Sequence, residues 1–165
     1  AGGTSGILWG LLLETIGEAF ATTAAPDAAS VAGGVRLGAA AVARVGRADL
    51  GDKTMLDVLI PFADRLDAAA ERGASLAVAW SDAADRAGPD AAATAGLRPR
   101  VGRARPLAER SIGTPDAGAV SMALCVKAVA GVLNAADRTD VGPTNAGATN
   151  AGPDEGDNDR EETQS

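Results

Sequence analysis

Residues 2–6, with the sequence GGTSG, form the first group that could bind a phosphorylated ligand. Glycines let the backbone approach a phosphate closely, and the free amides at the start of a helix point toward it. Thr4 and Ser5 add hydroxyl donors, and the apolar run at residues 7–13 is typical of a buried helix. The motif predicts an anion site at a helix N-terminus. The alternative is a glycine-rich turn in which a serine caps the helix.

A second motif, GDKTMLD at residues 51–57, opens another helical segment. The start of that helix again offers free amides, and Lys53 supplies positive charge. Met55 has a soft side chain that can lie against an adenine ring. Thr54 and Asp57 have the spacing of a capping box. The alternative interpretation is a capped helix in which Met55 belongs to the core.

The third motif is a loop rich in arginine. Five arginines, two glycines and three prolines fall within residues 98–115, which predicts a long irregular segment. Arginine binds phosphate oxygens through two parallel hydrogen bonds, although Glu109 and Arg110 could equally be structural partners. Asp116 then begins the last helix. Its carboxylate could cap that helix or accept a hydrogen bond from a nucleotide hydroxyl.

The composition excludes several classes of chemistry. The chain has no histidine and one cysteine, Cys125, which excludes serine–histidine and cysteine–histidine catalysis and an intrachain disulfide. This cysteine usage is consistent with the reducing cytoplasm. Of the net charge of −7, the segment 139–165 carries −6, so the body has no basic face for nucleic acid. Neither a Walker A nor a Rossmann glycine motif occurs.

Helices must position these motifs. Apolar residues repeat at helical spacing at about residues 5–21, 27–45, 75–87, 90–95 and 116–136, and from residue 54 onward. Pro61 should kink the segment that begins at residue 54. No strand pattern of useful length occurs, so we predict an all-α antiparallel helix bundle over residues 1–138. Residues 7–13 are too short for a membrane span, and no basic residue precedes them as in a signal peptide.

Two further expectations concern the C-terminal part. The last helix should bury an apolar stripe made of Met122, Cys125, Val126, Val129, Val132 and Leu133. Residues 139–165 are mostly Asp, Glu, Asn and Gly and repeat the sequence TNAG. Such a segment cannot bury enough apolar surface to offset its ordering entropy, so we expect an acidic disordered tail.

The motifs also occur in a recognisable order: GGTSG, then GDKTMLD, then GRAR, ERSIG and DAGA within residues 102–119. In this order they resemble the L subunit, or L domain, of dihydroxyacetone kinases over residues 1–136. The resemblance implies a barrel of antiparallel helices with a nucleotide bound in the loops at one end. It implies phosphorylation of dihydroxyacetone held on a histidine of a K subunit or domain. The nucleotide is then ATP, or a resident ADP that the M subunit of a phosphotransferase system recharges.

The resemblance also assigns nucleotide-binding positions. They are the phosphate-contacting pair Thr4 and Ser5, the lining residues Gly46 and Met55, the arginine Arg103, and the closing loop Asp116, Ala117 and Gly118. Asp52 and Lys53 belong to the second motif without an assigned role. No catalytic residue and no metal ligand are assigned.

One part of the family pattern is absent from these residues. The family carries three aspartates, in and around a G-D-x-D-x-G-x-N-like motif, that bind two Mg²⁺ ions bridging the phosphates. No such motif occurs here, and the chain opens directly in its first glycine motif. We therefore expect a domain without its N-terminal metal-binding segment, an incomplete barrel with an exposed apolar interior. It should bind nucleotide weakly and be inactive by itself.

Two other functions fit the sequence. A related helical domain of fatty acid kinases is similar in fold, although GDKTM and ERSIG fit the dihydroxyacetone type better. A non-catalytic helical remnant that only binds a partner would account for the missing aspartates.

Overall fold

The structure is a computed structural model and describes residues 3–21, 25–102 and 108–140. Over these residues the chain is helical and has no strand, which confirms the all-α prediction. The helices in chain order are α1 (Gly3–Phe20), α2 (Ala28–Gly46), α3 (Leu56–Glu71), α4 (Leu76–Ala93), the 3-10 helix η1 (Thr94–Gly96), α5 (Ala108–Ser111) and α6 (Ala117–Asp140).

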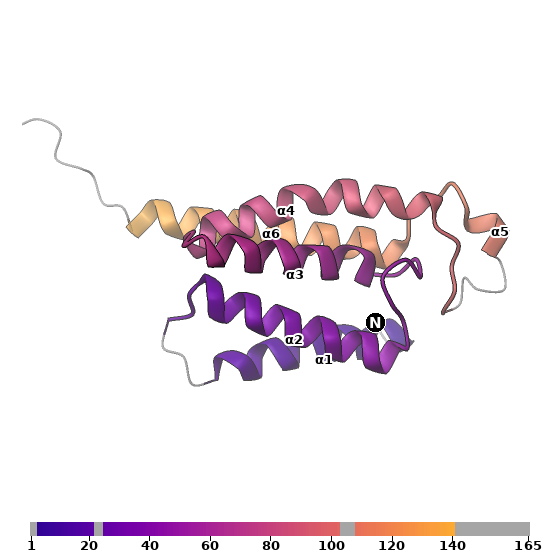
Figure 1. The fold of residues 1–165 in the computed structure, drawn as a ribbon, viewed down its shortest axis with the longest axis horizontal. Coiled ribbons are helices and arrows are strands. Elements are labelled where there is room, and N and C mark those ends of the chain that lie inside the picture. Colours follow the sequence, from indigo (N-terminus) through magenta and orange to yellow (C-terminus); the bar gives the residue numbers. More distant parts are fainter. Residues whose placement is uncertain (1–2, 22–24, 103–107, 141–165) are drawn as a thin grey trace, which may run out of the picture.

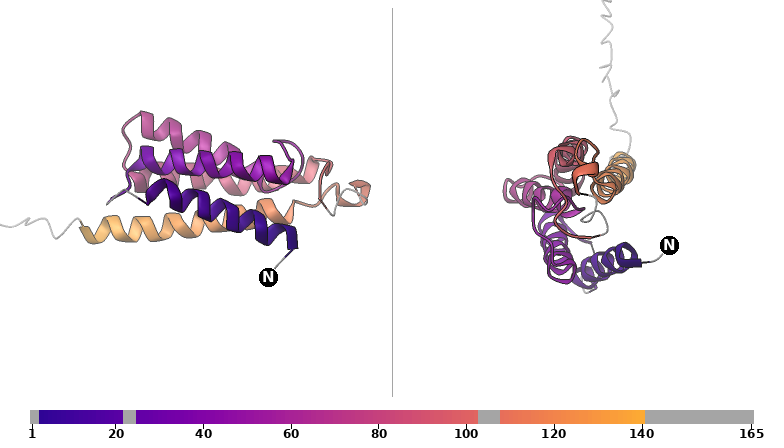
Figure 2. Two further views of the ribbon diagram at one scale, coloured as in Figure 1. Left: turned by 90° about the horizontal axis from the view of Figure 1, so that it is seen from below. Right: turned by 90° about the vertical axis from the view of Figure 1, so that its right-hand side faces the viewer.

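The five long helices lie alongside one another in a curved row (Figure 1). Each packs against the next in the chain, α1 on α2, α2 on α3, α3 on α4 and α4 on α6, and neighbours run antiparallel. Seen end-on, the row bends so that α1 and α6 stand at its two ends (Figure 2). The bundle is therefore antiparallel, as predicted, and open between its first and last helices.

The core is centred on α3. Five apolar residues follow the helical spacing that begins at residue 54, and all of them are buried: Met55, Val58, Leu59, Phe62 and Leu66. Mostly alanine and valine surround them on α2 and α4, so the helices must approach closely to bury area. The closest approach is at Gly38, where a Cβ would lie 2.6 Å from Leu12 Cδ1 of α1.

α4 differs from the prediction of two short helices at 75–87 and 90–95. It is one helix from Leu76 to Ala93, with Pro89 inside it. Pro89 has no backbone N–H, so the carbonyl oxygen of Asp85, four residues earlier, loses its hydrogen bond within the helix. Asp85 and Pro89 are both exposed, so water can satisfy that carbonyl. Two hydrogen bonds from Arg65 of α3 to Asp90 hold the following turn in place, at 2.6 and 3.2 Å. α3 likewise continues through Pro61.

α6 also differs from its prediction. Met122 and Val126 of the expected stripe are buried, but Cys125 is exposed, and Val129 and Val132 are 40% and 68% exposed. The stripe was wrong in this part because α6 packs against α4 and α3 on one side only. The helix continues to Asp140, two residues past the expected boundary at residue 138. Residues 141–165 lie outside the described residues, and their disorder stays a prediction.

Two helices are long and apolar enough to cross a membrane by length and composition, at Ala28–Gly46 and Ala117–Thr139. Half of the apolar window of α2 is buried within the bundle, as in a core helix of a soluble protein, but only 22% of that of α6. The absence of a membrane span therefore stays a prediction.

Candidate functional site

The motifs predicted to bind an anion gather at one end of the bundle. α1, α3 and α6 begin there, and α2 and α4 end there (Figure 1). Helix N-termini carry the positive end of the helix dipole and unpaired amides. At this end, which we call the loop end, the starts of α1, α3 and α6 therefore favour negative charge, whereas the ends of α2 and α4 do not.

The loop between α2 and α3 has an unusual backbone. Arg47 and Lys53 adopt left-handed conformations with φ of 49° and 63°, and Gly51 has φ of 93°. Two carboxylates fix this shape. Asp52 accepts from the amide of Asp49 at 2.9 Å, and Asp57 accepts from the amides of Gly51 and Thr54 at 2.5 and 2.6 Å.

These contacts answer the capping prediction for the second motif. Asp57 accepts from the Thr54 amide, which is one half of the predicted capping box. The Thr54 hydroxyl accepts from the amide of Leu56 at 3.1 Å, one residue earlier than the box requires. Asp57 and Asp52 are thus engaged in holding the loop.

Lys53 joins this loop to the arginine-rich loop. Its side chain is buried, and Nζ donates to the carbonyl oxygens of Leu97 at 3.1 Å and Ser111 at 2.6 Å. Sequence reasoning missed this role, because the second motif alone does not indicate which distant carbonyl oxygens the side chain reaches.

The start of α6 contacts the start of α3. Asp116 caps α6 by accepting from the amide of Ala119 at 2.8 Å, so the capping interpretation is confirmed. Its own amide donates to the buried hydroxyl of Thr94 at 2.8 Å. A Cβ on Gly118 would lie 3.3 Å from the backbone nitrogen of Met55, so only glycine fits without displacement. Three of the predicted nucleotide-binding residues, Met55, Asp116 and Gly118, are therefore neighbours.

Met55 itself is only 6% exposed and belongs to the hydrophobic core, as the alternative interpretation held. The amides of Ala117 and Gly118 have no acceptor among the described residues, so they remain able to donate to a ligand. The role of Asp116 toward a nucleotide hydroxyl is untested and stays a prediction.

The remaining predicted residues divide into two groups. Gly46, at the end of α2, lies beside Leu8 of α1, since a Cβ on Gly46 would be 3.7 Å from both δ carbons of Leu8. Leu8 is three residues after the exposed Ser5 in the same helix, so Gly46 lies near the first motif. Arg103 and the side chain of Thr4 lie outside the described residues.

The described flanks of the arginine-rich loop are tied together. Glu109 pairs with Arg98 at 2.5 Å, and among the described residues no ion pair joins it to Arg110, the partner suggested by the sequence. Arg100 lies 3.7 Å from the Asp52 carboxylate, and its amide donates to the Asp52 carbonyl at 3.3 Å. Within 97–102 and 108–113 the loop is thus organised by the second motif.

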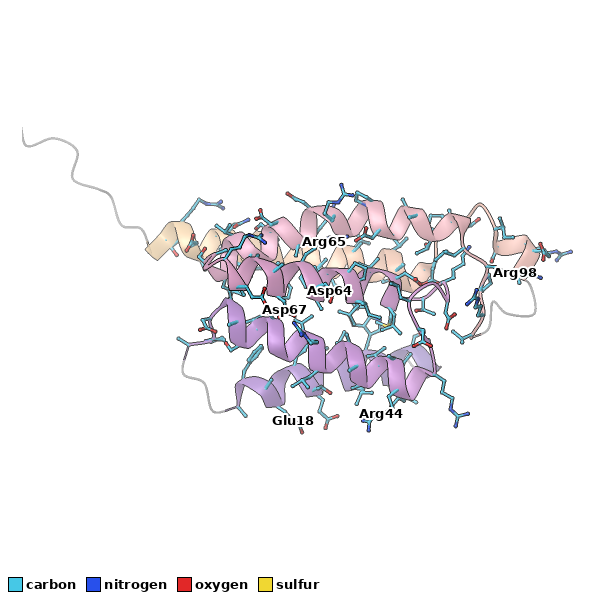
Figure 3. The ribbon with its side chains drawn as sticks, in the orientation of Figure 1. Glu18, Arg44, Asp64, Arg65, Asp67 and Arg98 are labelled. Carbon is cyan, nitrogen blue, oxygen red and sulfur yellow. The ribbon has the colours of Figure 1, made fainter. Side chains whose placement is uncertain are left out.

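Two hollows accompany these elements. One of about 250 Å³ lies beside the loop end and includes Asp57 and Asp90, whose carboxylates would repel phosphate. A larger open one, of about 700 Å³, lies between α1 and α2 with Glu18 and Arg44 at its rim (Figure 3). It is lined by α1 and α2 alone, whereas the motif residues converge at the loop end, so we place the site at the loop end.

No group of three or more metal-ligating side chains occurs in the part of the chain that the structure describes. The described residues therefore do not fit a Mg²⁺ site of the kind the family uses.

Comparison with protein-family models decides the family. The model described as the DAK2 domain matches residues 1–131. This chain belongs to the DAK2 domain family of the dihydroxyacetone kinases. The recognition made from the motifs is confirmed.

Named relatives extend the comparison. The DAK2 chain is 54% identical over 130 residues to D-erythrulose kinase of Mycolicibacterium smegmatis, covering 79% of this chain and 22% of the relative. It is 50% identical over 134 residues to L-erythrulose kinase of Pectobacterium atrosepticum, covering 81% and 23%. The chain thus spans less than a quarter of these enzymes.

Two further matches connect the chain to the dihydroxyacetone type. It is 35% identical over 129 residues to the ADP-binding subunit DhaL of the PEP-dependent dihydroxyacetone kinase of Escherichia coli, covering 78% of this chain and 61% of that subunit. The crystal structure of the dihydroxyacetone kinase of C. freundii superposes with a TM-score of 0.55 at 28% identity, covering 79% of this chain and 21% of that one.

Proposed function

We propose that the DAK2 chain is the nucleotide-binding domain of a kinase for short-chain ketoses, with ADP or ATP bound at the loop end. The observation that supports this most is the DAK2 match over residues 1–131, whose three motifs meet at one end of the bundle. Free amides and three helix N-termini at that end suit phosphate groups. The 35% identical subunit of Escherichia coli is an ADP-binding subunit, which supports the same ligand.

Five of the predicted residues have a role in this proposal. Ser5, with Thr4, would donate to the phosphates from the start of α1. The amides of Ala117 and Gly118 would donate from the start of α6, while Gly118 keeps that backbone open. Arg103 would meet the remaining phosphate charge through its guanidinium group.

The substrate would be held by a second unit. The motifs point to dihydroxyacetone, whereas the two relatives at 50% identity or more are described as erythrulose kinases. We propose that the phosphoryl group passes to such a ketose on a K-type subunit or domain. An M-type subunit would take part only in a phosphotransferase-linked enzyme. The proposal places the chain in the cytoplasm, consistent with its single unpaired cysteine.

Magnesium enters the proposal only as a general requirement of phosphoryl transfer, because it bridges and neutralises the phosphate oxygens. The described residues do not gather a ligand set for it, so the whole phosphate charge would be met here by amides, hydroxyls and arginine. Nucleotide affinity should accordingly be modest.

Titration calorimetry of ADP, with and without MgCl₂, tests the proposal. We expect saturable binding to the wild-type chain and a loss of about tenfold in Arg103→Ala, equivalent to one hydrogen bond to a charged group. Arg72→Ala is the matched control, because Arg72 is exposed at the opposite end of the bundle and should leave binding unchanged. A folded wild-type chain that gives no binding heat at millimolar ADP would refute the proposal.

A further inference from the structure

Lys53 is a buried cation without a carboxylate partner. Lys53 is 5% exposed, and among the described residues no acidic side chain lies within ion-pair distance of its Nζ atom. Removing an ammonium group from water is costly unless other polar groups replace the water. Lysine normally keeps its charged end in solvent by extending its stem, so the inward position needs a specific cause.

Two backbone carbonyls provide the contacts that hold it. Leu97 O and Ser111 O lie 3.1 and 2.6 Å from Nζ, and they are 14 residues apart on opposite flanks of the arginine-rich loop. One side chain of the α2–α3 loop thus closes the base of a different loop. Lysine suits this task because its compact ammonium can donate to several acceptors at once.

Backbone geometry supports the same contact. Lys53 has φ of 63°, a left-handed conformation that disfavours any residue with a Cβ. The strain is tolerated because hydrogen bonds on both sides determine the loop. Asp52 fixes it from within through the Asp49 amide, and the Asp52 carbonyl accepts from Arg100 on the first flank.

The two flanks carry further contacts to the start of α6. The Gly113 amide donates to the Ala95 carbonyl at 2.8 Å, and Thr94 accepts from the Asp116 amide. A displacement at Leu97 or Ser111 would therefore move the backbone that leads into Asp116 and the free amides after it.

From these contacts we propose that Lys53 is a positioning residue for nucleotide binding. It acts by holding the flanks at residues 97–102 and 108–113 in register with the start of α6. The inference rests on the proposed function and adds to it a residue that touches the loop backbone and not the nucleotide.

The experiment compares Lys53→Met with Lys127→Met in the full chain. Met keeps the length of the stem but removes the charge and the donors. Lys127 is the only other lysine of the chain and is exposed on α6. Hydrogen exchange at the Arg100 and Gly113 amides reports the loop flanks, ADP calorimetry reports affinity, and circular dichroism reports the melting temperature.

In Lys53→Met we expect both amides to exchange at least about tenfold faster and ADP affinity to fall about tenfold, the equivalent of one hydrogen bond to a charged group. Lys127→Met should match the wild type in all three readouts. Lys53→Gln, which keeps neutral donors, should recover part of the affinity, and it serves as the second variant if Lys53→Met does not fold.

Three results would overturn the inference. ADP affinity unchanged in a folded Lys53→Met would leave only a structural lysine, even if the melting temperature fell. Unchanged exchange at Arg100 and Gly113 would contradict the loop contact. Absence of ADP binding by the wild-type chain would refute the proposed function and the nucleotide role of Lys53 with it, whereas failure of Lys53→Met alone would leave the proposed function standing.

Discussion

At the residue scale, two aspartates begin helices at opposite ends of the bundle. Asp116 caps α6 at the loop end and is partly buried. Asp27 caps α2 at the other end, where it is exposed and forms a reciprocal capping box with Ser30. The same chemistry thus serves a proposed ligand site in one place and helix stability alone in the other.

The exposed cap predicts a dependence of stability on pH. The hydrogen bond from the Ser30 amide is the main cause that lowers the pKa of Asp27 below its ordinary value of 3.8, and the Ser30 side chain adds to it. A carboxylate with a lowered folded-state pKa stabilises the fold above its unfolded-state value and loses that contribution as pH falls through the folded-state value.

Asp27→Asn should test this, because Asn caps a helix about as well but does not titrate near pH 4. The melting temperature of the wild type should fall relative to the variant between about pH 5 and pH 3. Asp82→Asn is the control, since Asp82 is exposed and its side chain makes no hydrogen bond within the described residues. A constant difference between wild type and Asp27→Asn across this range would contradict the interpretation.

At the scale of elements, Gly38 of α2 marks a close contact with α1. A Cβ at Gly38 would lie 2.6 Å from Leu12 Cδ1 and 3.3 Å from Ile16 Cγ1, so Gly38→Ala should force the two helices apart. We expect a loss of about 1–3 kcal/mol in the free energy of unfolding. Urea unfolding measures it.

Gly33→Ala is the matched control in the same helix. A Cβ there would meet no atom within 4 Å, so the gain in helix propensity should stabilise the chain by about 0.5–1 kcal/mol. If Gly38→Ala and Gly33→Ala changed the free energy of unfolding equally, the contact between α1 and α2 would not require glycine at position 38.

The sequence allowed the elements to be predicted where periodicity was strong. α3 was predicted at about the right place, beginning two residues later than expected, because its five apolar positions at helical spacing are all buried. α4 was split wrongly because a proline in a sequence does not reveal whether the residue whose carbonyl it leaves free is exposed, as Asp85 is. The contacts of Lys53 could not be predicted either, since Leu97 and Ser111 are 44 and 58 residues away.

At the scale of the whole molecule, the curved row leaves apolar side chains uncovered on both of its end helices. Ile7 and Leu13 of α1 are 67% and 63% exposed, and Leu124 and Val132 of α6 are 65% and 68% exposed. The expectation that the interior of the barrel is exposed stays a prediction, because these values describe single side chains. Exposed apolar side chains favour association, because burying one fully contributes about 1.5–3 kcal/mol.

We therefore expect the isolated chain to associate as its concentration rises, and the double variant Leu124→Lys with Val132→Lys to remain monomeric. Sedimentation velocity over a hundredfold range of concentration, roughly a 2.7 kcal/mol span in association free energy, measures the difference. Both side chains are mostly in solvent, so the melting temperature of the double variant should be nearly unchanged.

Val126→Lys places the same charge at a position that is 5% exposed, and it should unfold the chain. A wild-type chain that stays monomeric throughout would mean that the uncovered face of α6 is not adhesive, whereas a double variant that still associates would direct attention to α1.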